Sequence, residues 1–152
     1  MKYVRWIAMM ALATALAMPG CRKDNGNSQE GSDEQSAPAD PMKNKGIGPI
    51  SSLELAAIDP SLAQKGAGLF EIKCSSCHKL DERHVGPALR DVTTRRSPEW
   101  IMNMILNPQE MIEKDPIAED LFATFMTPMA NQNLTQDEAR AVLEYLRSEA
   151  GK

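Results

Sequence analysis

Two cysteines and a histidine stand together in the segment Cys74-Ser75-Ser76-Cys77-His78. Two thiols separated by two residues can add to the two vinyl groups of one haem, because a single turn of chain spans that edge of the porphyrin. A histidine directly after the second cysteine then lies under the iron, where a ring nitrogen can ligate it. The pattern predicts a c-type attachment site for one covalently bound haem.

Other uses of the same two thiols fit the sequence less well. A thioredoxin-like redox pair would need a βαβ pattern around it, which the flanking residues lack. Half a zinc site would need further ligands, and the chain offers only Cys21 and His84 besides this segment. A structural disulfide across two residues would be strained. We therefore interpret the segment as a haem site.

Helix-entry signals recur around this motif and indicate the elements that position it. Each joins a capping side chain to a proline or an acidic residue. The five signals are Asp59-Pro60, Ser97-Pro98, Asn107-Pro108, Asp115-Pro116 and Thr135-Gln136-Asp137-Glu138. After the last, apolar residues follow at the spacing of an amphipathic helix, namely Ala139, Val142, Leu143 and Leu146. With no convincing strand, the sequence predicts an all-α domain whose loops can wrap a bound group.

Composition supports a bound group and argues against nucleic-acid binding. Aromatic residues make up 5% of the 152-residue chain, which is lean for a core that must be self-sufficient, whereas methionine occurs ten times. A buried cofactor would fill the centre of such a domain. The net charge of the chain is −4, and the part from Ser51 onward contains 16 acidic and 11 basic residues. A basic surface that could neutralise phosphates is therefore not expected.

Over residues 60–149 the chain resembles the class I monohaem c-type cytochromes. The resemblance rests on the segment 65–70 (KGAGLF) before the motif, on 85–89 (VGPAL) after it, and on 134–138 (LTQDE) with 143–146 (LEYL) near the end. It implies an all-α, cytochrome c-like fold wrapped around one haem c. It also implies a final helix that crosses the first one, and an electron carrier rather than an enzyme.

The resemblance also implies the ligands of the haem. Cys74 and Cys77 would hold the thioethers and His78 would be the proximal ligand, its other ring nitrogen donating to the backbone carbonyl of Pro87. The distal ligand of the family is a methionine about five residues before the leucine that precedes the final helix, which here indicates Met129. Met126 is the competing candidate.

Several other residues could serve either the core or the haem. Met102, Met104 and Met111 are expected in the core or the pocket wall, and His84 on the surface. The Trp100 N–H could reach a haem propionate. Arg90, Arg95 and Arg96 form a basic spot that is either solvated surface or a propionate or docking patch. Acidic residues on solvated helix faces are expected at Glu110, Glu113, Asp115, Glu119 and Asp120.

The N-terminal third reads as a leader and a linker. Residues 1–20 show a charged start and an apolar run typical of an export signal, and Gly20-Cys21 resembles the end of a lipoprotein signal. Cys21 would then carry a lipid. Residues 21–50 are expected to form a lipid-anchored flexible tether and 51–152 the cytochrome c domain, with Ile47 to Ile58 laid on it as an extended arm. A cleaved signal with a soluble periplasmic product, or an uncleaved anchor, is the alternative.

These features predict a carrier of single electrons on the periplasmic side of a membrane. The expected partners are a membrane quinol-oxidising complex or another donor, and a terminal oxidase or reductase as acceptor, within a respiratory chain. One alternative is a haem protein with an open distal site, acting as a sensor or a peroxidase-like enzyme. Another is a binding module in which the two cysteines hold a metal or form a disulfide.

Overall fold

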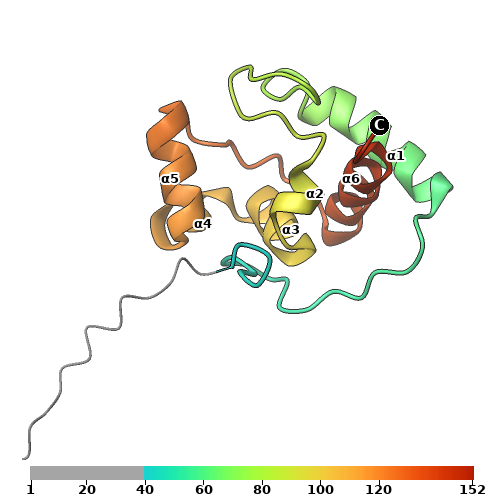
Figure 1. Cartoon of the computed structure of the whole chain (residues 1–152), viewed down its shortest axis with the longest axis horizontal. Coiled ribbons are helices and arrows are strands. Elements are labelled where there is room, and N and C mark those ends of the chain that lie inside the picture. Colours follow the sequence, from blue (N-terminus) through green and yellow to red (C-terminus); the bar gives the residue numbers. More distant parts are fainter. Residues whose placement is uncertain (1–39) are drawn as a thin grey trace, which may run out of the picture. The chain divides into compact units, whose positions relative to one another are not determined.

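The computed structural model describes residues 40–152, so the predicted export signal, Cys21 and most of the tether lie outside the described residues. The described part contains helices and no strand (Figure 1). The helices are α1 (Pro60–Lys73), α2 (Val92–Arg95), α3 (Pro98–Leu106), α4 (Pro108–Lys114), α5 (Pro116–Phe125) and α6 (Gln136–Glu149). The prediction of an all-α domain is confirmed.

The longer helices begin where capping chemistry predicts. The side chain of Asp59 accepts from two backbone N–H groups of α1, and that of Asp115 does the same for α5. The Ser97 hydroxyl accepts the Trp100 N–H at 3.1 Å and starts α3. Thr135 forms the predicted capping box of α6. In each case the side chain satisfies N–H groups that have no partner inside the helix.

Helices α1 and α6 cross in close contact (Figure 1). Gly66 is buried at the crossing, where any Cβ would overlap the carbonyl group of Ala141 and approach the Tyr145 Cβ to 2.9 Å. One turn further along α1, the ring of Phe70 lies 5.3 Å from that of Tyr145. Because backbones can approach this closely only without a side chain between them, the glycine sets the distance between the two helices. The family-based expectation that the last helix crosses the first is confirmed.

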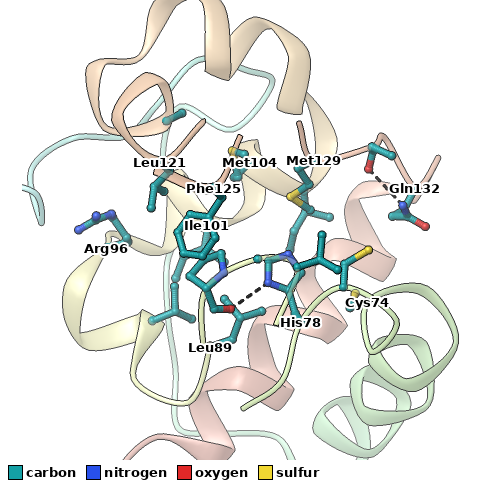
Figure 2. Close-up of a pocket in the computed structure, with 18 of the residues that line it drawn as sticks. Cys74, His78, Leu89, Arg96, Ile101, Met104, Leu121, Phe125, Met129 and Gln132 are labelled. Atoms are coloured by element: carbon teal, nitrogen blue, oxygen red, sulfur yellow. Dashed lines mark hydrogen bonds between the residues drawn. The ribbon is translucent and has the colours of Figure 1, made fainter. Parts of the chain in front are cut away.

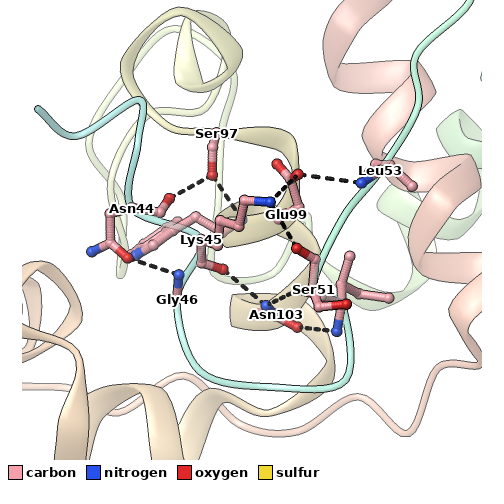
Figure 3. Close-up of polar contacts among 10 residues, drawn as sticks. Asn44, Lys45, Gly46, Ser51, Leu53, Ser97, Glu99 and Asn103 are labelled. Atoms are coloured by element: carbon pink, nitrogen blue, oxygen red, sulfur yellow. Dashed lines mark hydrogen bonds and ion pairs between the residues drawn. The ribbon is translucent and has the colours of Figure 1, made fainter.

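An extended arm ahead of α1 is tied to α3 by polar contacts (Figure 3). Asn103, which is 1% exposed, donates to the carbonyls of Lys45 and Ile50 at 2.9 Å and accepts the Ile50 N–H at 3.0 Å. The Ser97 hydroxyl donates to the Asn44 carbonyl. Contacts with α3 therefore begin near Asn44, ahead of the arm of Ile47 to Ile58 that the sequence predicts. A contact between residues more than fifty positions apart leaves no local trace in the sequence.

Asp115 was expected on a solvated helix face, and the structure places it elsewhere. The residue is buried, with 2% of its surface exposed. It accepts the Trp100 indole N–H at 3.0 Å and the Asn44 amide at 2.6 Å while it caps α5. The N–H of Trp100 is thereby satisfied inside the protein, so the suggested bond from this group to a propionate is wrong. The other acidic residues of that set are exposed or half-buried, as predicted.

Candidate functional site

A cavity of about 220 Å³ opens between α1, the loop after it, α3, α5 and the loop before α6 (Figure 2). Its lining is mostly apolar, including Val85, Leu89, Ile101, Leu121 and Phe125. A single water needs only about 10–15 Å³ of such space and several polar partners. The cavity is therefore far larger and more apolar than a hydration site, and it suits a sizeable apolar group.

The predicted attachment motif begins directly where α1 ends. The Cys74 N–H donates to the Phe70 carbonyl at 2.8 Å, and the His78 N–H closes one further turn on the Cys74 carbonyl at 2.8 Å. This turn places both cysteines and the histidine along the same edge of the cavity. Both cysteines are free thiols, with Cys74 half-buried and Cys77 exposed. Burial, and secondarily the neighbouring Cys77, raises the pKa of Cys74 to about 11.

His78 is held by its second ring nitrogen, as predicted. Its Nδ1 lies 3.0 Å from the Pro87 carbonyl oxygen. Because a carbonyl only accepts, this contact assigns the proton to Nδ1 and leaves the lone pair of Nε2 available to a metal. Burial lowers the pKa of His78, against an opposing effect of the Pro87 contact, so the neutral, ligating form is favoured. A Cβ on Gly86 would come within 2.8 Å of Nδ1, which explains a glycine before this proline.

The two candidate methionines occupy different environments. Met129 is half-buried, lines the cavity and points its sulfur toward the His78 ring from the opposite wall (Figure 2). Met126 ends α5 in a left-handed conformation, with φ of 53°, and the residue is 76% exposed. Met126 is not among the residues that line the cavity. The geometry thus pairs His78 with Met129, and Met126 faces solvent.

The remaining candidate residues divide between the cavity and the surface. Arg95 and Arg96 line the cavity, whereas Arg90 forms ion pairs with Asp81 and Glu149. Met104 lines the cavity. Met102 and Met111 are core residues, which confirms the expectation for all three. His84 is exposed. Within residues 40–152, no group of three or more His, Cys, Asp or Glu side chains is placed to share a metal, so a zinc site finds no support.

The comparison with protein families agrees with this geometry. The family model described as Cytochrome c matches residues 63–150. The chain belongs to the cytochrome c family.

Similar proteins include solved structures and one shorter match. Cytochrome c from Rhodothermus marinus is 49% identical, with a TM-score of 0.67, over 68% of this chain and 90% of that one. An engineered form of it, bound to a carbene intermediate, is 47% identical, with a TM-score of 0.65. That match covers 69% of this chain and 92% of the engineered one. Cytochrome c-551 of Stutzerimonas stutzeri is 45% identical over 42 residues. That match spans 27% of this chain and 40% of the relative.

A cytochrome c domain carries covalently bound haem c, and the site fits that group. The cavity is apolar, two free thiols line its edge, and an imidazole nitrogen is available beside them. Haem supplies an iron that can take up and release one electron. Members of the family are typically electron carriers.

Sequence reasoning missed three polar residues of the cavity wall, namely Lys73, Thr127 and Gln132. Gln132 lines the cavity, and its side-chain amide donates to the Ala130 carbonyl at 3.1 Å (Figure 2). The available signal was the run of three amide residues, 131–133, just after Met129. Side-chain amides in a loop often hydrogen-bond to nearby backbone, so the run could have been read as a loop-fixing device.

Proposed function

We propose that this cytochrome c transfers single electrons between redox proteins, with Cys74 and Cys77 as the thioether sites and His78 and Met129 as the axial ligands. The observation that carries the proposal is the placement of Met129 and His78 on facing walls of one apolar cavity. An imidazole and a thioether are the protein ligands of electron-transfer cytochromes c.

Two filled axial positions favour electron transfer over catalysis. With His78 and Met129 both committed to the iron, a substrate has no open coordination position. The apolar wall keeps water away, so few dipoles must reorient when the charge changes. The alternative, an open distal site for a sensor or a peroxidase-like enzyme, is less well supported, because Met129 stands where such a site would have to open.

Electrons would enter and leave where the cavity meets the surface. Cys77, Val85 and Phe122 each line the cavity and are exposed. An apolar rim of this kind suits brief docking, since redox encounters use small interfaces. The partners proposed from the sequence are a quinol-oxidising complex or another donor, and a terminal oxidase or reductase.

The test of the haem site is a double substitution, Cys74→Ser with Cys77→Ser, in protein exported by a host that assembles c-type cytochromes. Without both thiols we expect no haem to remain with the chain after denaturation, because no covalent bond holds it. The measurement is haem staining of denatured protein together with the visible spectrum. Unchanged staining in the double variant would contradict the proposed attachment.

We further propose that the protein acts at the periplasmic face of a membrane, anchored by a lipid on Cys21. The support is the signal-like pattern of residues 1–21. Within residues 40–152, no helix is both long and apolar enough to cross a bilayer.

The anchor is tested by Cys21→Ala and cell fractionation. We expect the haem-stained protein to lose its association with the membrane fraction, because stable anchoring requires the attached acyl chains. Haem staining itself should not change, so the variant is also the matched control for the two cysteines of the motif. A variant that stays fully membrane-bound would show that something other than Cys21 anchors the protein.

A further inference from the structure

A carboxylate is buried directly behind the wall of the haem cavity. Asp115 accepts the Trp100 indole N–H at 3.0 Å and the Ala118 backbone N–H at 2.9 Å. Both donors belong to buried residues that line the cavity, whereas Asp115 itself does not line it. A single layer of side chains therefore separates this acidic group from the group that fills the cavity.

The contacts of Asp115 fit a carboxylate in its charged form. Its Oδ1 accepts three N–H groups, those of Trp100, Ile117 and Ala118. Its Oδ2 accepts the side-chain amide of Asn44, a residue of the arm, at 2.6 Å. All four partners are donors, and a charged carboxylate is a group that only accepts. Asn44 is the one partner of Oδ2 in the described part of the chain, so the arm completes the set of donors around this charge.

No cation neutralises this charge by direct contact. Among residues 40–152, none of the ion pairs includes Asp115. The guanidinium of Arg96 lies 5.4 Å from the centroid of the Trp100 ring, and Arg96 lines the cavity. Burial and then Arg95 lower the pKa of Arg96, while Asp115 acts in the opposite direction. The charge of Asp115 thus influences a residue of the cavity wall, because little water intervenes to screen it.

We propose that the buried negative charge of Asp115 lowers the reduction potential of the haem, and that Asn44 of the arm helps to hold this charge in place. The inference rests on the proposed electron-carrier function. Oxidation removes one electron from the iron and so adds a positive charge, which a nearby negative charge stabilises. A unit charge about 10 Å away shifts a one-electron equilibrium by about tenfold where the effective dielectric constant is about 20.

The test is redox equilibration of the holoprotein with a mediator dye of known potential. Asp115→Asn removes the charge and keeps a side-chain oxygen that can accept the Trp100 N–H. We expect the equilibrium constant for reduction of the iron to rise about tenfold, equivalent to a potential about 59 mV higher for one electron. Asp120→Asn is the matched control, because Asp120 is exposed on the same helix and does not line the cavity. Water and salt screen that charge, so the constant should change by less than about twofold.

Asn44→Ala separates the charge of Asp115 from its structural role. This variant removes one hydrogen bond and keeps the carboxylate, so the melting temperature should fall while the equilibrium constant stays within about threefold. Equal shifts in Asn44→Ala and Asp115→Asn would show that loosened packing, and not the charge, changes the potential, and would refute the proposal.

An exchange of the two side chains covers the case in which Asp115→Asn alone does not fold. Asn44→Asp combined with Asp115→Asn restores a donor and an acceptor to this contact and moves the charge to the half-buried arm. The equilibrium constant should again rise, because the charge then lies farther from Trp100. A constant equal to that of the unchanged protein would refute the tuning role. The electron-carrier function is judged separately: a holoprotein that the dye cannot reduce reversibly would refute that function itself.

Discussion

Replacing Met129 with alanine is expected to abolish the long-wavelength methionine–iron absorption band and to lower the reduction potential. Met129 is the methionine that faces His78 across the cavity, and a thioether favours the reduced iron. Axial ligands tune haem potentials over a range of about 0.8 V, so loss of this ligand should lower the potential by on the order of 0.1 V. The variant should also bind cyanide or imidazole readily. Absorption spectra and potentiometric titration measure these effects.

The matched control is Met126→Gly, which removes the other thioether of the loop. Met126 is exposed and has a positive φ, a conformation that glycine adopts without strain. We expect the absorption band and the potential to be unchanged. The opposite pattern, in which Met126→Gly loses the band and Met129→Ala keeps it, would assign the distal position to Met126 and require the loop to rearrange.

Replacing Gly66 with alanine is expected to destabilise the domain by about 3 kcal/mol, the upper part of the usual range for overpacking. The added methyl group would overlap the backbone carbonyl of Ala141, which cannot rotate away as a side chain could. Helices α1 and α6 would have to separate, and the contact between Phe70 and Tyr145 would loosen. Urea unfolding of the oxidised holoprotein gives the change in free energy.

Gly68→Ala in the same helix is the matched control. A Cβ at position 68 meets nothing within 4 Å, so the substitution adds no clash. Alanine is the better helix former, and the free energy of unfolding should rise by about 0.5–1 kcal/mol. Equal effects of the two substitutions, in either direction, would show that the close approach of α1 and α6 does not limit stability.

Much of the helical framework could be predicted from the sequence because its signals are local. A capping side chain acts on N–H groups two or three residues away, so Asp59, Ser97, Asp115 and Thr135 mark helix starts by themselves. The short helix α2 was missed because neither a proline nor a capping-box acid follows Asp91.

The buried polar contacts could not be predicted in the same way. Asp115 looks like one more acid on an exposed helix, and only the fold brings Trp100 and Asn44 to it. Asn103 holds the arm by contacts to Lys45 and Ile50, more than fifty residues earlier. Such pairings depend on how the helices pack. Packing is determined jointly by contacts throughout the chain, so no short sequence pattern encodes it.

By itself the sequence determined the covalent chemistry, since the spacing from Cys74 to His78 fits two thiols and an imidazole to one porphyrin edge. Only the tertiary structure decided which methionine faces that imidazole. Met126 and Met129 lie three residues apart, and their side chains are chemically identical. The left-handed end of α5 directs Met126 to solvent, and the loop beyond it carries Met129 into the cavity wall. The direction of a side chain in a loop depends on backbone angles and long-range contacts, which a local pattern does not encode.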